Sequence, residues 1–312
     1  MGVRMANFEA GPDGEPRVTV VVMTRDRRDQ LQQALGNLRD LSGDVPVVVV
    51  DNGSCDGTPA AVRAAFPDVV VVELGEIRGA GARTAGARVA TTPYVAFRDD
   101  DSWWAPGALK RAADLLDAVP SLGLVAARTL VGPEERIDAL SRELAASPLP
   151  TGRDLPGPRI LGFLACAAVV RRDAFLDAGG FHPVVFFLGE ETVLALDLAA
   201  AGWALCYVDD VVAHHHPQPG PTRGGRRRLQ ARNALLSSWL RRPARVALRD
   251  TWRLGRRAVT DAEARGALLD AVRRARPALA ARRRLPAHVE ADLRLLERTR
   301  SPLGRPPGPA TG

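Results

Sequence analysis

The chain of 312 residues has little cysteine and no long apolar run. Its three cysteines, Cys55, Cys166 and Cys206, are far apart, which excludes a disulfide framework and a zinc site built on paired cysteines. We therefore expect a reducing, cytoplasmic compartment. No apolar run reaches about 18 residues, so no membrane-spanning helix is predicted. Residues 1–16 are polar and rich in glycine and proline, without the apolar centre of a signal peptide.

Lysine is also nearly absent, with Lys110 the only one, and the positive charge is unevenly distributed. The net charge is +7, and residues 221–300 contain 22 arginines against seven acidic residues. Apolar residues lie between these arginines, so we hypothesise that this region docks on an anionic membrane surface as a peripheral membrane segment. RNA binding is a rival interpretation, weakened by the few aromatic residues there. A third interpretation is that this region is a helical appendage exposed to solvent.

The N-terminal two-thirds alternates between β-branched runs and segments with helical spacing. Val-rich runs of this kind are typical of strands buried on both faces of a parallel, doubly wound α/β sheet. The predicted strands cover residues 17–23, 45–50, 69–74, 94–97, 122–129 and 203–212, with helices after most of them. We expect a loop at 134–158 and four parts to the chain: a flexible tail (1–16), an α/β domain (17–220), a basic helical extension (221–300) and a disordered tail (301–312).

Polar residues follow three of the predicted strands. They are Thr24-Arg25, Asp51 and the triplet Asp99-Asp100-Asp101. Ligands of open α/β sheets bind beyond the carboxyl ends of the strands, where these groups would meet. Three adjacent carboxylates repel one another unless a cation binds, and Mg²⁺ or Mn²⁺ would do so together with phosphate oxygens. The alternative is a solvated acidic turn before a helix.

Other candidate groups come later in the chain. The glycines of residues 79–86 have neither the spacing nor the position of a dinucleotide-binding fingerprint, so they indicate close packing instead. Arg83 would point at a phosphate or lie in solvent. Glu190 and Glu191 begin a predicted helix, where they would either complement the helix dipole or serve as a general base. One imidazole of residues 214–216 would complete an acidic metal site, unless these histidines form an exposed loop.

Taken in order, these motifs resemble the family 2 glycosyltransferases, which have a GT-A nucleotide-sugar-binding fold. The resemblance covers about residues 17–220. It is carried by the first-strand segment 20–27, by Asp51-Asn52-Gly53-Ser54-Cys55-Asp56-Gly57-Thr58, by the Asp-x-Asp pair Asp99 and Asp101, by Gly189-Glu190-Glu191 and by His214. The chain departs from the usual family residues at Met23, Arg25, Asp26, Ile77 and Thr84, and its acidic pair is Glu-Glu rather than Glu-Asp.

The resemblance implies a role for each of these positions. Thr24, Arg25, Asp51 and Gly53 would line the nucleobase end of the donor site, and Arg83 with Asp99 or Asp100 would contact the ribose and diphosphate. Asp101 and Asp99 would hold a divalent metal (Mg²⁺ or Mn²⁺), with His214 as a further ligand. Glu191 would be the general base, with Glu190 as the alternative. Trp103 and Trp104 would stack on an acceptor sugar, unless one of them is in the core.

The implied activity is that of an inverting, metal-dependent glycosyltransferase. It would move a sugar from a nucleotide-diphospho-sugar to a hydroxyl of a cell-envelope glycan or a lipid-linked acceptor. A sugar nucleotidyltransferase is the nearest other enzyme class, but it usually needs a glycine-rich loop after the first strand, and residues 24–30 contain no glycine. A non-catalytic membrane- or nucleic-acid-binding protein on the same fold is the non-enzyme alternative.

Overall fold

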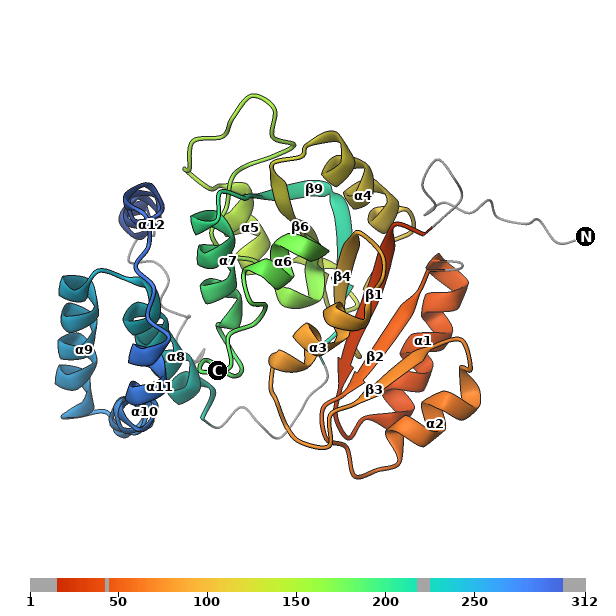
Figure 1. Ribbon diagram of the computed structural model, residues 1–312, viewed down its shortest axis with the longest axis horizontal. Coiled ribbons are helices and arrows are strands. Elements are labelled where there is room, and N and C mark those ends of the chain that lie inside the picture. The colour runs from red at the N-terminus through yellow and green to blue at the C-terminus, as the bar shows by residue number, and fades with distance from the viewer. Residues whose placement is uncertain (1–15, 43–44, 218–224, 300–312) are drawn as a thin grey trace, which may run out of the picture.

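A nine-stranded mixed sheet forms the centre of the computed structural model, which describes residues 16–42, 45–217 and 225–299 (Figure 1). The strands are β1 (Val18–Thr24), β2 (Val47–Asp51), β3 (Val70–Glu73), β4 (Tyr94–Asp99), β5 (Ser102–Trp104), β6 (Leu122–Val131), β7 (Arg136–Ile137), β8 (Ala168–Arg171) and β9 (Ala204–His215). Their order is β3-β2-β1-β4-β8-β6-β9-β5, with β7 on β6. Six strands run in one direction, and β5, β7 and β8 run in the other. The predicted α/β class with a mostly parallel sheet is confirmed.

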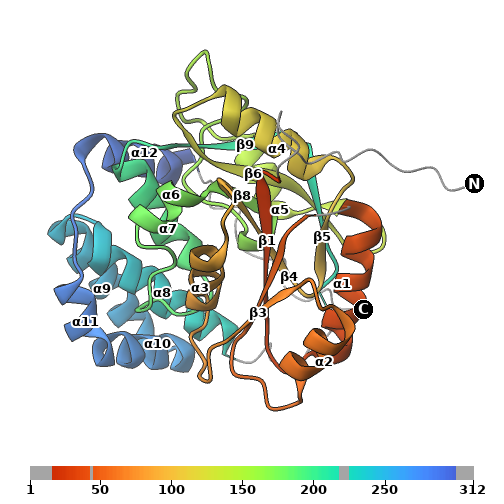
Figure 2. The same ribbon diagram turned by 45° about the vertical axis from the view of Figure 1, so that its right-hand side comes forward.

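Helices cover both faces of the sheet. Strand β1 sends Val20 and Val22 to one face and Val21 to the other, and all three are buried. On the first face lie α1 (Arg28–Ser42), α2 (Thr58–Ala65) and α4 (Ala108–Ala118). On the second lie α3 (Gly81–Val89), α6 (Arg172–Asp177) and α7 (Glu190–Ala200), and Figure 2 shows α3 beside the sheet.

Glycine lets α3 approach the sheet closely. A Cβ at Gly86 would lie 2.5 Å from a methyl group of Val21 on β1 and 2.8 Å from one of Val50 on β2. Such contacts are too short for any side chain, so only glycine fits at this position. The prediction that the small residues of 79–86 serve close packing is therefore confirmed at Gly86, and this packing brings Arg83 of the same helix to the strand ends.

The chain between residues 134 and 158, predicted as a loop, holds two short elements. They are β7 and the helix α5 (Ala139–Ala145). The Asp138 carboxylate accepts a hydrogen bond from the Leu140 backbone amide at 2.7 Å, which caps α5. Next, a 3-10 turn at Ala165–Ala167 leads into β8, and the turn and all of β8 except Arg171 lie within the apolar run 160–170.

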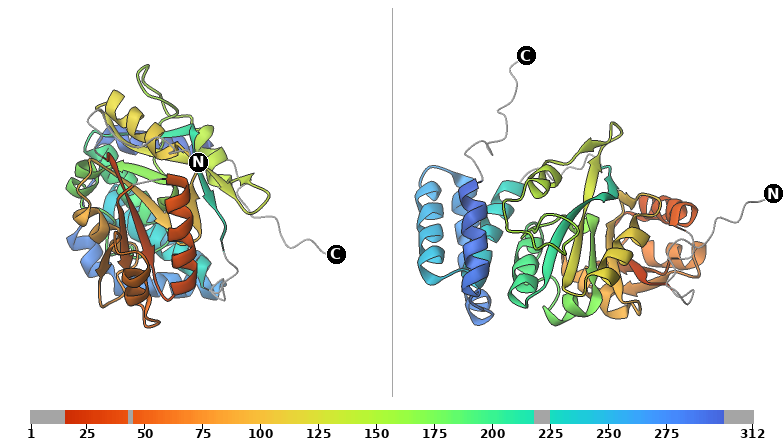
Figure 3. Two further views of the ribbon diagram at one scale, coloured as in Figure 1. Left: turned by 90° about the vertical axis from the view of Figure 1, so that its right-hand side faces the viewer. Right: turned by 90° about the horizontal axis from the view of Figure 1, so that it is seen from above.

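The C-terminal part is helical and packs directly on the α/β part. It contains α8 (Arg226–Arg241), α9 (Ala244–Ala258), α10 (Ala262–Arg273), α11 (Ala275–Ala280) and α12 (Ala287–Thr299), gathered at one end of the molecule (Figure 3). Val185 and Val193 share one apolar cluster with Leu236 and Leu240 of α8. Arg241 of α8 forms a two-pronged ion pair with Asp197 of α7. The predicted tails, residues 1–16 and 301–312, lie almost wholly outside the described residues.

Candidate functional site

The predicted donor-site residues gather at one edge of the sheet. In the register of the parallel strands, Thr24 pairs with Asp51, and Met23 pairs with Asp99. Thr24, Asp51 and Asp99 end β1, β2 and β4, so their side chains lie at the carboxyl ends of three adjacent strands. Thr24 and Asp51 are both buried.

At the ends of β1 and β2, two loops hold each other through hydrogen bonds. The Cys55 backbone amide donates to Asp26 at 2.7 Å, and the Asp26 amide donates to the Ser54 hydroxyl at 2.9 Å. Gly53 has φ +80° and lies against the backbone of Glu76, which leaves little room for a side chain. Arg25 is exposed beside these loops.

Two carboxylates of the acidic triplet, those of Asp99 and Asp100, each pair with a different arginine. Asp99 pairs with Arg83. Asp100 accepts hydrogen bonds from Thr24 at 3.3 Å and from Arg27 at 2.6 Å. Burial raises the pKa of Asp100, and the charge of Arg27 counteracts part of that rise. A solvated acidic turn would not show these contacts, so the alternative of a bland surface turn is excluded.

Arg27 is a site residue that the sequence reasoning missed. Its guanidinium also lies 3.7 Å from Asp101, so one arginine contacts two members of the triplet. The sequence did contain a signal, since Arg27 follows the end of the first strand by three residues, where the ligand edge of the sheet was expected.

Arg83 links the acidic triplet to the acidic pair at the start of α7. Its side chain is 2% exposed, and its second nitrogen lies 3.7 Å from Glu190. The alternative of a solvated surface arginine is wrong. The guanidinium already pairs with Asp99 and Glu190, and its predicted contact with a diphosphate stays a prediction.

Glu190 and Glu191 differ in their access to the site. The Glu190 residue is 2% exposed and one of its carboxylate oxygens has no hydrogen-bond partner, whereas Glu191 is half-buried. Burial raises the pKa of both carboxyl groups, and the negative charge of Glu191 adds to the rise at Glu190. A buried carboxylate with a raised pKa is suited to accept a proton near neutral pH.

The loop before these acids has an unusual backbone. Phe186, Leu188 and Gly189 have φ values of 70°, 68° and 93°, in the left-handed region that non-glycine residues rarely adopt. The Phe186 carbonyl accepts a hydrogen bond from the Ala80 amide at 2.7 Å. A Cβ at Gly79 would lie 2.2 Å from that carbonyl oxygen, so glycine is required where the two loops cross.

Helix α8 holds this loop from the other side. The Asn233 side-chain amide donates to the Phe187 and Leu188 carbonyls, both at 2.6 Å, and Asn233 is 1% exposed. Arg232 donates to the Val185 carbonyl at 3.1 Å. Residues of the basic extension therefore fix the strained backbone next to Glu190 and Glu191, which the sequence did not predict.

The pairing of β5 with β9 decides which histidine of residues 214–216 lies near the acidic triplet. Strand β5 pairs with β9 so that His214 lies opposite Trp103 and His215 opposite Ser102. His214 stacks on Trp103 at 5.0 Å and lies 3.0 Å from Glu135. His215 lies 3.5 Å from Asp101. The structure therefore places His215, rather than the predicted His214, against Asp101, and a metal ligand among these histidines stays a prediction.

The two tryptophans of the acidic segment also separate. Trp104 is 1% exposed and belongs to the core beneath α4, so an acceptor cannot reach its ring. The prediction that Trp104 binds the acceptor is wrong, and the alternative that one tryptophan is core is confirmed. Trp103 is half-buried between His214 and His216.

The groups around Asp101 fit a divalent metal only in part. Within residues 16–42, 45–217 and 225–299, no three histidine, cysteine or acidic side chains are placed to hold a metal ion. Asp101 and His215 are nonetheless adjacent, at 14% and 26% side-chain exposure. The Asp101 carboxylate suits Mg²⁺ or Mn²⁺ when a diphosphate and water supply further oxygen ligands, and the imidazole of His215 suits Mn²⁺ better than Mg²⁺.

An α/β sheet with an acidic triplet at the strand ends, an arginine beneath it and an acidic pair at a helix start defines a GT-A-type sugar-transferring protein. The family model "Glycosyl transferase family 2" matches residues 19–179, just over half of the chain, so the chain belongs to that family. The predicted family is confirmed.

Two relatives come from Mycobacterium tuberculosis. The chain is similar to its N-acetylglucosaminyl-diphospho-decaprenol L-rhamnosyltransferase, with 28% identity over 273 residues, 74% of this chain and 88% of the relative. It is also similar to its pre-mycofactocin glycosyltransferase, with 33% identity over 213 residues, 64% of this chain and 43% of the relative.

Solved structures show the same fold. The mannosyltransferase PcManGT from Pyrobaculum calidifontis, in complex with GDP-Man and Mn²⁺, superposes with a TM-score of 0.55 at 24% identity, over 89% of this chain and 79% of that one. Residues 1–349 of TarS from S. aureus, with UDP-GlcNAc, give 0.56 at 17% identity, over 71% and 66% of the two chains. At these identities the likeness establishes the GT-A fold alone.

Proposed function

We propose that the protein transfers a sugar from a nucleotide-diphospho-sugar to a hydroxyl of a lipid-linked glycan acceptor of the cell envelope, with inversion at the anomeric carbon. One observation carries this proposal. Arg83 joins the acidic triplet at the donor end of the site to the acidic pair at the start of α7. This link supports the proposal that the groups that would hold a diphosphate and the groups that would accept a proton belong to one connected site.

The donor would lie across the tips of β1, β2 and β4. The nucleobase and ribose would contact the loops of Arg25, Asp51 and Gly53, and the diphosphate would face the acidic triplet. We propose Asp101 and His215 as the protein ligands of the divalent metal, and Asp99 as a group held in place by Arg83. When bound, the metal would offset the negative charge that the departing nucleoside diphosphate acquires. Arg27 lies 2.6 Å from Asp100 and would add positive charge at the same edge.

We propose Glu191 as the general base, because the Glu191 residue is half-buried, whereas Glu190 is 2% exposed and its carboxylate already faces Arg83 at 3.7 Å. The acceptor oxygen would form a bond to the anomeric carbon as its proton passes to Glu191. The bond from that carbon to the β-phosphate oxygen breaks, and its electron pair leaves with the nucleoside diphosphate. A single displacement of this kind inverts the anomeric configuration. Trp103 would form part of the acceptor side.

The acceptor class rests on a likeness to one relative. The mycobacterial rhamnosyltransferase is named for a sugar attached to a polyprenyl diphosphate, and its alignment spans 74% of this chain. Its name supports a lipid-linked acceptor for this protein. We propose that the reaction takes place at the inner face of the plasma membrane. The three free cysteines, two of them buried, agree with that reducing side.

Two measurements test the proposed function. Thermal-shift assays with UDP-, dTDP- and GDP-sugars, with and without Mn²⁺, should give a metal-dependent stabilisation by one of these donors. That donor should then release nucleoside diphosphate when a short-chain polyprenyl-diphospho-sugar is added. Absence of stabilisation by any donor, together with absence of release, would contradict the proposal. Pyrophosphate release from a nucleoside triphosphate and a sugar phosphate would instead indicate a nucleotidyltransferase.

A further inference from the structure

Helix α9 turns an apolar stripe outward. Leu248 and Trp252 within the helix and Val259 just after its end are 70%, 60% and 76% exposed. Their spacing of four and seven residues places them on one side of the helix. The opposite side is buried, with Leu254 and Ala258 packed inward. Figure 1 and the view from above in Figure 3 place α9 at the outer edge of the molecule.

A row of arginines runs beside this stripe. Arg245, Arg249 and Arg253 are spaced by four residues, so they share one side of α9 next to the apolar side. All three are exposed. The Arg256 guanidinium lies over the Trp252 ring at 4.9 Å from its centre. An exposed tryptophan beside cationic groups is the arrangement found at membrane–water interfaces.

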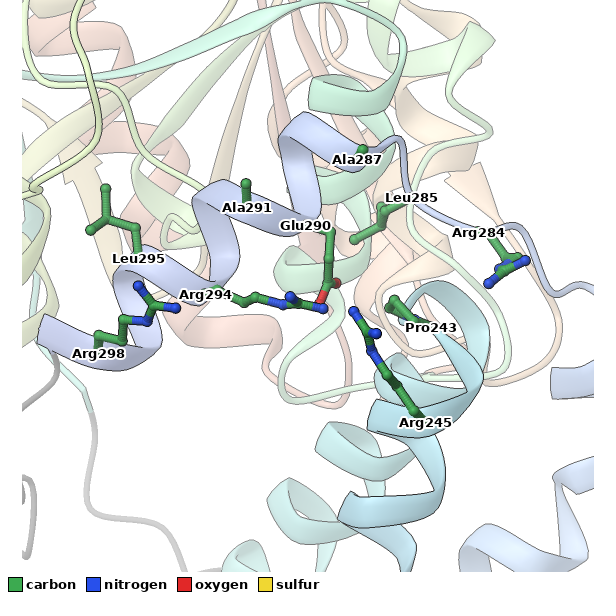
Figure 4. Close-up of a pocket in the computed structure, with 10 residues that line it drawn as sticks. All are labelled: Pro243, Arg245, Arg284, Leu285, Ala287, Glu290, Ala291, Arg294, Leu295 and Arg298. Carbon is green, nitrogen blue, oxygen red and sulfur yellow. The ribbon is translucent and has the colours of Figure 1, made fainter.

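The arginine row faces two adjoining hollows between α9 and α12, of about 480 and 770 Å³ (Figure 4 shows the first). Together they are lined by seven arginines and three acidic residues. The arginines are Arg242, Arg245, Arg249, Arg253, Arg284, Arg294 and Arg298, and the acids are Asp250, Glu290 and Glu297.

The acidic residues of these hollows neutralise only some of the arginines. Arg242 and Arg294 pair with Glu290, and Arg249 pairs with Asp250 at 2.9 Å. Among the described residues, the other four arginines of the hollows have no carboxylate partner. These are Arg245, Arg253, Arg284 and Arg298. The surface therefore carries positive charge that nothing within the described protein compensates, which favours an anionic ligand from outside.

We propose that α9 and the arginine-lined hollows between α9 and α12 form a docking surface for an anionic lipid bilayer. The arginines would bind lipid phosphates, while Leu248, Trp252 and Val259 enter the interfacial layer. Nucleic acid would use the arginines but has no need of an exposed aliphatic stripe. A second copy of this chain would bring the same positive charge against it. This inference rests on the proposed function, since a lipid-linked acceptor would be met at such a surface.

The experiment uses the full chain in co-sedimentation with vesicles of phosphatidylcholine, with or without phosphatidylglycerol. The wild-type protein should bind the anionic vesicles much more strongly than the neutral ones, and added salt should weaken that binding. Each arginine removed from the row should reduce binding roughly fivefold. The double variant Leu248→Ser/Trp252→Ser should reduce binding by roughly tenfold or more.

Matched controls carry the same changes elsewhere: Val89→Ser for the apolar residues and Arg142→Gln for the arginines, both exposed in the α/β part. These controls should bind as the wild type does, and circular dichroism should show that all variants are folded. Equal loss in the controls, equal binding to both kinds of vesicle, or no binding would overturn the inference. So would loss of dimerisation or of RNA binding in the α9 variants with vesicle binding unchanged.

Sugar transfer to a water-soluble acceptor analogue separates this inference from the proposed function. Variants of α9 should retain that transfer, because no residue of the stripe or the row belongs to the catalytic site. Vesicle binding without any transfer would refute the proposed function alone. Transfer with vesicle binding that the α9 variants leave unchanged would refute the docking surface alone.

Discussion

Arginines have opposite surroundings at the two ends of this molecule. At the strand tips, Arg83 is 2% exposed and lies between two carboxylates. On α9, Arg245 and Arg253 are exposed, and among the described residues neither has a carboxylate partner. Burial makes an unpaired charge costly, so a buried arginine needs acids around it, whereas water stabilises an exposed one. The first kind of arginine organises a site, and the second remains available to an external anion.

The largest expected effect concerns the acids that Arg83 organises. Glu191→Gln should lower kcat by about 10²- to 10⁴-fold, because general-base catalysis contributes about that much. Donor affinity, measured by calorimetry, should stay unchanged. Glu190→Gln is the matched control and should cost less. A larger loss of kcat in Glu190→Gln than in Glu191→Gln would show that the base is misassigned.

A direct test of the comparison replaces one arginine of each kind by methionine. Arg83→Met should lower the free energy of unfolding by about 3–5 kcal/mol, because it leaves buried carboxylates without their cation. Arg253→Met removes an exposed and unpaired charge, so its effect should stay within about 0.5 kcal/mol. Urea denaturation followed by circular dichroism measures both. Similar losses in the two variants would contradict the distinction drawn between them.

The contact between the two regions is tested at Asn233. Asn233→Ala should lower the free energy of unfolding by about 1–3 kcal/mol, because it leaves the Phe187 and Leu188 carbonyls unpaired. It should also lower kcat while leaving the donor KM unchanged, since the loop precedes the acidic pair rather than the donor edge. Gln230→Ala, at an exposed position on the same helix, is the control. A stability loss with kcat unchanged would limit Asn233 to a structural role.

A smaller effect separates the two histidines. His215→Asn should weaken Mn²⁺-dependent nucleoside diphosphate binding about 10- to 100-fold, as loss of a metal-supporting group usually does. His214→Asn, one residue away, should have little effect, because His214 faces Glu135 and Trp103. Calorimetry with and without Mn²⁺ gives both values. Equal effects of the two substitutions would remove His215 from the proposed metal site.

The smallest expected effect concerns the pH dependence of kcat. Burial raises the pKa of Glu191 and Glu190 above their usual 4.5, and the base works only when it is deprotonated. Activity should therefore be low below the raised pKa and increase with pH through it, so the acidic limb of the kcat profile should lie above pH 4.5. A limb near pH 4.5 would show that the base is not in this buried setting. Because the folded pKa is raised, this ionisation also reduces folding stability as pH rises through the same range.

Much of the α/β part followed from local sequence pattern. Strand β1 was predicted from its run of valines, and the alternation of strands with helices indicated a parallel sheet with its polar groups at one edge. Thr24, Asp51 and Asp99 indeed end adjacent strands. The short strand β5 was missed, because three residues carry no periodic signal.

Other features depended on contacts between distant segments. His215, and not the expected His214, lies against Asp101, because the pairing of β5 with β9 decides which side chains face Asp101. A shift of one residue exchanges the two faces of a strand, and no local pattern fixes it. The same alternation buries Trp104 and leaves Trp103 at the surface of the site.

The sequence by itself determined the strands, the acidic triplet, the acidic pair and the family, because each is written in a short run of residues with its own spacing. Only the tertiary structure decided what these groups do to one another. It placed Arg83 between Asp99 and Glu190, and it brought Asn233 under a loop some 45 residues earlier. Such contacts depend on how packed helices bring side chains together from far along the chain, and hydrophobic periodicity records only which face of an element is buried.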